Sequence, residues 1–388
     1  MTDTTTATAR QEIFNRGSAQ MRLHKFKDAL ESFSKLKTFS VNSPRLLMLI
    51  AYCHSQTGES NLALQEFARV ASWEPDAFNN EGGWGNELEK EKKFDEAIKH
   101  YDRALKSESH YLFALRHRAY CFTCISNNEA ALRDLNSALA LEPDEPYTLL
   151  QRIEAEHALG KHKEAVTDSR AVIAIEPKNS TAWYHLGDSL AHLERWSEAC
   201  AACTQAIKLD PKYFNAFCNR AWAERELGMR NQAIADYTAA LRIDPKSDFA
   251  HYSRGLMLRD EKKFAQSIAD LSAAIKEAPN NAFYFCARGC SEVKNHDYQK
   301  AIEDCTESIK LNASRLHPYL SRGEAYAGLG NYDLALSDLN YVIKYNPTDI
   351  EALTERAKVY KKLKKPALAA VDLACLDKLA AEKKSKRE

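Results

Sequence analysis

The 388-residue sequence contains no apolar run that approaches the ~18 residues of a membrane-spanning helix. Its first nine residues, MTDTTTATA, include no apolar segment, so we expect no secretory signal peptide. Lysine and arginine together number 54, as do aspartate and glutamate, so the chain has no general attraction to nucleic acid or to an anionic membrane. The ten cysteines have scattered spacings in a long chain, which favours reduced thiols and therefore a cytoplasmic protein, or a nuclear one.

Common catalytic signatures are missing as well. The sequence has no H-E-x-x-H zinc motif, no G-x-S-x-G nucleophile motif and no dinucleotide-binding glycine motif. His185 and Asp188 could resemble an acid–base pair on one helix, but no nucleophile or third partner has matching spacing. We therefore predict a protein that is not an enzyme and that binds no cofactor.

What the sequence does contain is an internal period of 34 residues. Small residues recur at the eighth and twentieth places of the units and proline at the thirty-second, as in Gly187, Ala199 and Pro211. Apolar residues recur at three- and four-residue spacing in 182–193 and 197–209, so each unit is predicted to form two helices. Small residues let the two helices approach closely, and proline ends the second because it cannot donate an amide hydrogen bond. The eleven units begin at residues 10, 44, 78, 112, 146, 180, 214, 248, 282, 316 and 350.

The segment WYHLGDSLAHLERWSEACAACTQAIKLDP (183–211) resembles the tetratricopeptide repeat (TPR), and the resemblance extends over about residues 10–380. It implies an all-α fold, an α-solenoid in which antiparallel helical hairpins form a right-handed superhelix and the first helices line a concave groove. We expect a disordered N-terminal tail at 1–9, a TPR array of eleven units at 10–379 and a basic C-terminal tail at 380–388. The residues that match the repeat pattern are Trp183, Leu186, Gly187, Ala199, Ala206 and Pro211.

Arginine and aspartate recur together at two further places of the repeat. Every unit with aspartate at the twenty-third place has arginine at the seventh, and only Arg16 has no matching aspartate. A cation on the apolar face of a helix needs a partner, so we predict a semi-buried, bidentate ion pair within each unit. The alternative is a row of ligand-facing cations, and duplication of one ancestral unit could also copy both residues without contact. The predicted structural pairs are Arg118–Asp134, Arg152–Asp168, Arg220–Asp236, Arg254–Asp270, Arg288–Asp304, Arg322–Asp338 and Arg356–Asp372.

By the same resemblance, certain places of each first helix face the groove. In the middle of the chain these places hold aromatic and polar residues, which suit an extended peptide because rings contact its side chains and polar groups bind its backbone. Several such aromatic residues, notably Phe249 and Phe283, could instead pack between neighbouring units. The residues assigned to the peptide groove are Tyr120, Tyr147, Tyr184, His185, Asp188, Asn219, Trp222, Arg225 and Tyr252.

We predict a scaffold or adaptor that binds a partner protein or an extended peptide in this groove. The alternative is a co-chaperone-type holder of unfolded polypeptides. Chaperone-binding TPR proteins grip a C-terminal carboxylate with lysine at the fifth place and asparagine at the ninth, and no unit here has that combination. We expect no such carboxylate clamp, no membrane partner and no nucleic acid. The basic residues in 361–365 and 382–388 could bind an acidic partner or form a solvated capping helix.

Two local motifs have more than one interpretation. The C-x-x-C pairs Cys121/Cys124 and Cys200/Cys203 lie in different units and within helices, so we interpret them as small packing residues and expect no metal site. The glycines at 82, 83 and 85 should each weaken a helix by about 1 kcal/mol, which predicts a loosened third unit that could act as a hinge. The alternative is that a ligand approaches their backbone closely.

Overall fold

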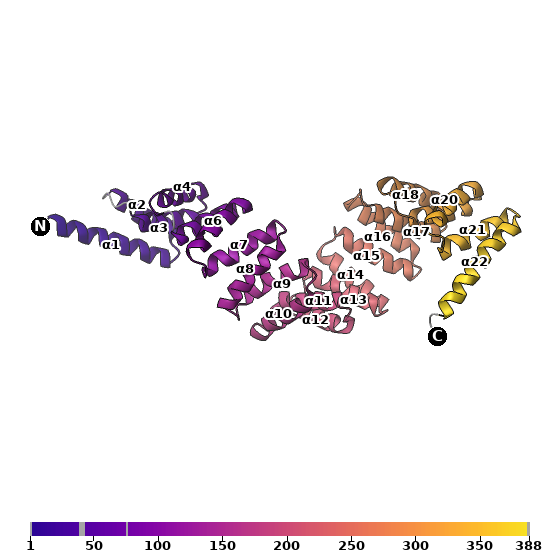
Figure 1. The fold of residues 1–388 in the computed structure, drawn as a ribbon, viewed down its shortest axis with the longest axis horizontal. Helices are drawn as coiled ribbons and strands as arrows, with labels where there is room; N and C mark the ends of the chain where they lie inside the picture. Colours follow the sequence, from indigo (N-terminus) through magenta and orange to yellow (C-terminus); the bar gives the residue numbers. More distant parts are fainter. Residues whose placement is uncertain (1, 39–42, 75–76, 386–388) are drawn as a thin grey trace. The chain divides into compact units, whose positions relative to one another are not determined.

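The computed structural model describes residues 2–38, 43–74 and 77–385 (Figure 1). Within these ranges the chain forms 22 α-helices and no strand. The chain divides into two compact parts, Met1–Leu193 and Glu194–Glu388, here called the N-terminal half and the C-terminal half.

Eleven of the described helices belong to each half. Those of the N-terminal half are α1 (Thr2–Arg22), α2 (Phe26–Thr38), α3 (Pro44–Gln56), α4 (Ser60–Ala71), α5 (Phe78–Lys90), α6 (Phe94–Ser107), α7 (Leu112–Cys124), α8 (Asn128–Leu141), α9 (Pro146–Ala158), α10 (His162–Ile175) and α11 (Ser180–His192). Those of the C-terminal half are α12 (Trp196–Leu209), α13 (Phe214–Glu226), α14 (Arg230–Ile243), α15 (Asp248–Asp260), α16 (Phe264–Glu277), α17 (Ala282–Lys294), α18 (Tyr298–Leu311), α19 (His317–Gly328), α20 (Tyr332–Tyr345), α21 (Ile350–Lys362) and α22 (Pro366–Ser385).

Consecutive helices pack against each other throughout each half. For example, α3 packs on α4 and α13 packs on α14. Several first helices also contact the first helix of the next hairpin, as α17 contacts α19. In nine hairpins the first helix begins at the first residue of a 34-residue sequence unit. The fold class predicted from the sequence, an all-α solenoid of antiparallel helical hairpins, is confirmed.

Small residues bring the two helices of a hairpin close together. A methyl group added to Gly85 would lie 2.7 Å from the ring of Tyr101, and one added to Gly289 would lie 2.8 Å from the sulfur of Cys305. At the twentieth place, Ala233 is completely buried. A larger side chain at either place would therefore hold the two helices apart.

The turn between the two helices places one residue of every hairpin in the left-handed region of the backbone. Four hairpins have glycine there, with φ between 69° and 82°. The other seven have a residue with a side chain, with φ between 56° and 64°, although this conformation costs such a residue about 1–2 kcal/mol. The seven residues are His24, Lys92, Ser126, Glu194, Lys262, His296 and Lys364.

The third hairpin differs from the loosened unit that we expected. The helix α5 runs without interruption through all three of its glycines. A methyl group on Gly82 would lie 2.7 Å from the ring of Tyr111, and one on Gly83 would lie 2.8 Å from the ring of Phe67. The glycines therefore make room for aromatic rings of the protein itself, and packing against these rings offsets their weak helix propensity.

Both ends of the chain also differ from the expected tails. The helix α1 begins at Thr2, so residues 2–9 are helical rather than a disordered tail. At the other end, α22 continues through Ser385, so the basic segment 380–385 belongs to the last helix, whereas residues 386–388 lie outside the described ranges. The helix α22 packs on α21 and is the second helix of the last hairpin, where it ends the array.

Candidate peptide-binding surface

The arginines at the seventh place lie between the two helices of their own hairpins. In each of the seven hairpins with a matching aspartate, Nε and Nη2 of the arginine donate to the two carboxylate oxygens at 2.6–3.0 Å. The carboxylates are buried, with Asp236 7% exposed and Asp372 1% exposed. These arginines therefore point into the hairpins and do not form a row of ligand-facing cations. Arg16, which has no matching aspartate, donates instead to Oγ of Ser32 at 3.4 Å.

Each of these seven arginines also reaches a third helix, a contact that we did not predict. Nη1 of Arg220 donates to Oγ1 of Thr204 at 3.0 Å, on the second helix of the preceding hairpin. The hydrogen bonds with Asp236 hold the pKa of Arg220 above its ordinary value, so this side chain stays charged. One guanidinium thus joins two neighbouring hairpins. The remaining acceptors are Asp102, Asn136, Thr238, Ser272, Thr306 and Asn340.

The sequence holds a signal for this third contact. The acceptor stands at the twenty-fifth place of the unit that precedes each arginine, and all seven residues there carry a side-chain oxygen. Three residues replace the arginine. Trp84 and Leu186 follow Ala68 and Arg170, whose side chains cannot accept a hydrogen bond, whereas Ile50 follows Ser34, whose side chain can. An oxygen at this place thus accompanies all seven arginines, although Ser34 shows that it also occurs without one.

Two residues assigned to the peptide groove, Tyr120 of α7 and Tyr147 of α9, line one pocket of about 320 Å³. Their side chains are 43% and 60% exposed, so their rings are accessible to a ligand. Phe113 and His117 form another part of the wall, with ring centroids 4.1 Å apart. This pocket, here called the tyrosine pocket, offers aromatic surface from the first helices of two consecutive hairpins.

Polar groups complete the tyrosine pocket. Glu89 of α5 accepts a hydrogen bond from Nδ1 of His117 at 3.0 Å. Nη2 of Arg116 donates to Glu142 at 2.5 Å, but Nε of Arg116 and Oε1 of Gln151 are buried without a hydrogen-bond partner within the described part of the chain. Arg116 and Gln151 thus add polar side chains to the pocket wall beside the tyrosines, and the C=O and N–H groups of a peptide are complements of such side chains.

Two other assigned residues, His185 and Asp188 of α11, are placed in the contact between α9 and α11 rather than on an open groove wall. His185 is 8% exposed, and its ring centroid lies 5.3 Å from that of His157 of α9. Burial lowers the pKa of His185 to about 4, so its imidazole is neutral at pH 7. Asp188 lies 3.2 Å from Nδ1 of the same His157. Stacking of consecutive hairpins thus buries His185 and leaves Asp188 half-buried, so neither offers the open surface that we expected. Tyr184, half-buried, lies beside His185. The assignment of these three residues to the groove stays a prediction.

The remaining four assigned residues belong to the C-terminal half. The ring of Trp222 packs on Trp196 with centroids 5.5 Å apart, and the ring of Tyr252 lies 4.9 Å from that of Tyr284. Each of these rings therefore has an aromatic neighbour from the protein itself. The four residues are Asn219, Trp222 and Arg225 on α13 and Tyr252 on α15.

Phe249 and Phe283, which had two interpretations, are both half-exposed. The guanidinium carbon of Arg315 lies 3.6 Å from the ring centroid of Phe283, which is typical of a cation–π contact. The ring of Phe249 lies 6.5 Å from that of Tyr237 on α14. Each phenylalanine thus packs partly against another residue of the protein and leaves the rest of its ring exposed.

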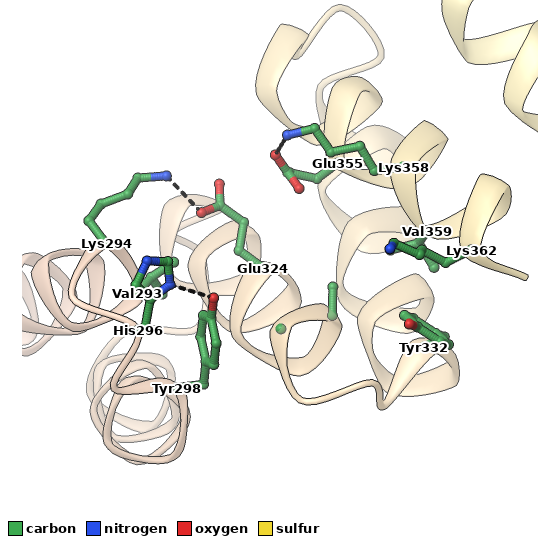
Figure 2. A pocket seen from close by; sticks show the side chains of 12 residues that line it. Val293, Lys294, His296, Tyr298, Glu324, Tyr332, Glu355, Lys358, Val359 and Lys362 are labelled. Carbon is green, nitrogen blue, oxygen red and sulfur yellow. Dashed lines mark hydrogen bonds and ion pairs between the residues drawn. The ribbon is translucent and has the colours of Figure 1, made fainter.

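A pocket of about 330 Å³ in the C-terminal half is lined mainly by charged and aromatic side chains (Figure 2). Figure 2 shows charges that pair with each other: Nζ of Lys294 lies 3.0 Å from Glu324, and Nζ of Lys358 lies 2.6 Å from Glu355. Because these four charges already have partners, the pocket offers a ligand fewer unsatisfied groups than the tyrosine pocket does.

Two further features bear on the expected function classes. Across residues 2–38, 43–74 and 77–385, no set of three or more histidine, cysteine, aspartate or glutamate side chains is arranged to hold a metal ion. In the C-x-x-C pairs, Cys121 and Cys203 are completely buried. Over the same ranges, no helix combines the length and the apolar character that crossing a bilayer requires.

Comparison with known families finds tetratricopeptide repeat models that match residues 180–213, 218–282 and 316–349. Over 135 residues the chain is 27% identical to the Hsp70-Hsp90 organizing protein 3 of Arabidopsis thaliana, covering 34% of this chain and 23% of that protein. It is 28% identical to the Hsp70-Hsp90 organizing protein 1 of Glycine max, covering 34% of this chain and 22% of that protein. The matches thus span less than a quarter of these relatives.

Solved structures share the fold at low sequence identity. The APC/C hetero-tetramer Cut9-Hcn1 matches with a TM-score of 0.50 and 15% identity, over 95% of this chain and 93% of that chain. The C-terminal part of a TPR repeat-containing protein from Cytophaga hutchinsonii matches with a TM-score of 0.52 and 16% identity, over 62% of this chain and 98% of that chain. These similarities concern the arrangement of helices and say nothing about ligands.

Proposed function

Because the chain is a tetratricopeptide repeat protein, we propose that it is a non-catalytic scaffold or adaptor whose tyrosine pocket binds an extended segment of a partner protein. Stacked repeats in general present elongated surfaces to such segments. The observation that carries the proposal is the tyrosine pocket, in which two exposed tyrosines from consecutive hairpins line one cavity with the polar side chains of Glu89, Arg116 and Gln151.

The chemistry of the pocket indicates what it would bind. An apolar or aromatic side chain of the partner would pack between the rings of Tyr120 and Tyr147, since aromatic surface gives large contact area at low conformational cost. The polar side chains of Arg116 and Gln151, which line the same pocket, would hydrogen-bond to the backbone next to that side chain. Apolar anchoring with backbone hydrogen bonds selects an extended conformation over a folded surface.

A library of random peptides displayed on phage tests this function. Peptides selected on the full-length protein should lose affinity by about tenfold or more in Tyr147→Ala, as expected for an aromatic anchor worth about 2 kcal/mol. The measurement is titration of fluorescent copies of the selected peptides. Tyr345→Ala is the matched control, because Tyr345 is 59% exposed and Tyr147 is 60% exposed.

Equal affinity of the wild-type protein and Tyr147→Ala for every selected peptide would contradict the proposal. An equal loss in Tyr345→Ala would do so as well, because it would show adhesion to exposed rings in general. Affinity purification of the two variants from cell extract, followed by mass spectrometry, would then identify which partners depend on the pocket.

A cytosolic or nuclear location belongs to the same proposal. All ten cysteines are present as thiols, and no disulfide joins any described pair. Thiols persist in the reducing environment of the cytosol and nucleus, which supports this location. Fluorescence imaging of the tagged protein tests it.

A further inference from the structure

A buried cysteine in the C-terminal half is surrounded by hydrogen-bond donors from two helices. Sγ of Cys290 on α17 lies 3.6 Å from Nε2 of His317 and 3.1 Å from Oγ of Ser321, both on α19. The thiol of Cys286, one turn earlier on α17, also hydrogen-bonds to Cys290. Three groups that can donate a proton thus converge on one sulfur, and a thiolate is the form of cysteine that accepts such hydrogen bonds best.

The titration of the neighbouring groups agrees with this geometry. The hydrogen bond from Cys286, with those from His317 and Ser321, outweighs the opposing effect of burial and lowers the pKa of Cys290 well below its ordinary value. The contact with Cys290 raises the pKa of His317 although burial opposes the rise; Glu351 adds to the rise and Arg259 reduces it. By contrast, burial raises the pKa of Cys305 well above its ordinary value.

Small molecules can reach this sulfur. Cys290, His317 and Ser321 line a pocket of about 410 Å³, here called the cysteine pocket. The Lys294–Glu324 ion pair seen in Figure 2 also lines the cysteine pocket. Cys290 itself is 8% exposed, so a bulky reagent is excluded and a small one is admitted.

The charges of the cysteine pocket favour a neutral reagent. Three cationic side chains and three anionic ones line it, so the pocket does not concentrate ions of either sign. Hydrogen peroxide is both neutral and small. The cationic residues are Arg259, Lys262 and Lys294, and the anionic residues are Asp260, Glu324 and Glu351.

We propose that Cys290 and His317 form a thiolate–imidazolium pair and that Cys290 is a site of oxidation by hydroperoxides. The thiolate sulfur attacks one oxygen of hydrogen peroxide, so an S–O bond forms while the O–O bond breaks. Sulfur loses two electrons and the peroxide gains them. The leaving hydroxide takes the Nε2 proton of His317 and departs as water, which leaves a sulfenic acid on Cys290 beside a neutral imidazole.

Peroxide titration of the full-length protein at pH 6 and pH 8 tests this site. The reaction is quenched with catalase at intervals, the protein is unfolded, and the remaining thiols are alkylated, so that the loss of thiol at each cysteine is measured by peptide mass spectrometry. We expect Cys290 to react first and to change in rate by less than about threefold between the two pH values. Free cysteine in solution, whose pKa is near 8.5, is the reference and should react about 50–100-fold more slowly at pH 6 than at pH 8. The exposed Cys124 is the comparison within the protein.

Two variants test whether the oxidation of Cys290 depends on the charge of His317 or only on the access of peroxide to the sulfur. His317→Gln keeps a hydrogen-bond donor but removes the charge, so oxidation of Cys290 at pH 6 should fall by at least about tenfold and become dependent on pH. His296→Gln is the control, because His296 lines the neighbouring pocket and does not line the cysteine pocket. Circular dichroism confirms that each variant is folded.

Three results would overturn the proposal: slower oxidation of Cys290 than of Cys124 in the wild-type protein at pH 6, an ordinary pH dependence at Cys290, or no change in His317→Gln. If His317→Gln does not fold, a pH titration of the ultraviolet absorbance of thiolates tests the pair instead. Subtracting the titration of Cys290→Ser from that of the wild type must then show a step below pH 7, and its absence contradicts the pair. None of these outcomes depends on peptide binding, so the proposed scaffold function is tested separately.

Discussion

The hairpins α5–α6 and α13–α14 carry different side chains at the seventh and twenty-third places of the repeat. In α13–α14 these are Arg220 and Asp236, which form a bidentate ion pair. In α5–α6 they are Trp84 and His100, whose rings stack with centroids 4.4 Å apart. Either pair joins the first helix to the second, so contact within a hairpin tolerates a change of chemistry.

The two hairpins differ in whether the residue at the seventh place also has a hydrogen-bond acceptor on the preceding hairpin. Nη1 of Arg220 is left over after the ion pair forms, and it donates to Thr204 of the second helix before it. The place equivalent to Thr204 before α5 holds Ala68, which has no acceptor for a side chain to use. A guanidinium therefore serves two interfaces at once because it has more donors than one carboxylate can use.

Breaking the Arg220–Asp236 ion pair should have the largest effect on stability. Asp236→Ala leaves Arg220 charged and half-buried without its carboxylate, so we expect a loss of about 3–5 kcal/mol in the free energy of unfolding. Denaturant titration monitored by circular dichroism measures this loss. Asp377→Ala, at an exposed position of α22, should change stability by less than about 0.5 kcal/mol. A loss that small in Asp236→Ala would show that the pair does not stabilise the hairpin.

Replacing both members of the pair should have a smaller effect. The sixth sequence unit already has Leu186 and Ala202 at these two places, so an apolar combination is compatible with the repeat. Arg220→Leu combined with Asp236→Ala strands no charge, and we expect a loss of about 1–2 kcal/mol, part of it from the donor withdrawn from Thr204. The same denaturant titration measures it. A double variant as unstable as Asp236→Ala alone would mean that the guanidinium is required for reasons beyond charge pairing.

Substitution in the turn of a hairpin should have the smallest effect on stability. Lys92 of the third hairpin has φ of 60°, whereas the seventh hairpin has Gly228 at the equivalent place. Glycine adopts this conformation without a steric cost, so Lys92→Gly should raise stability by about 0.5–1 kcal/mol after the entropy that glycine adds to the unfolded chain. Lys99→Gly, at an exposed position inside α6, should lower it by about 1 kcal/mol. Loss of stability in both variants would show that the side-chain contacts of Lys92 stabilise the protein by more than its backbone conformation costs.

Periodic features of this chain were predictable, and features that combine different repeats were not. The helix starts and the places of arginine and aspartate follow from the 34-residue period, because each hairpin has the same surface to bury. His185 shows where this reasoning ends: its place in the repeat indicates a groove residue, yet stacking against His157 buries it. Tyr120 and Tyr147 were found by place, whereas the unsatisfied Nε of Arg116 depends on what surrounds it.

The amino-acid sequence alone determines that this protein is an array of helical hairpins in one register, because no single 34-residue unit can bury its apolar face without its neighbours. Only the tertiary structure decides which side chains meet between hairpins. Cys290 and His317 stand 27 residues apart at non-equivalent places, and their contact exists because α17 packs on α19. Such contacts depend on the distance between successive first helices, and the 34-residue period of the sequence does not determine that distance.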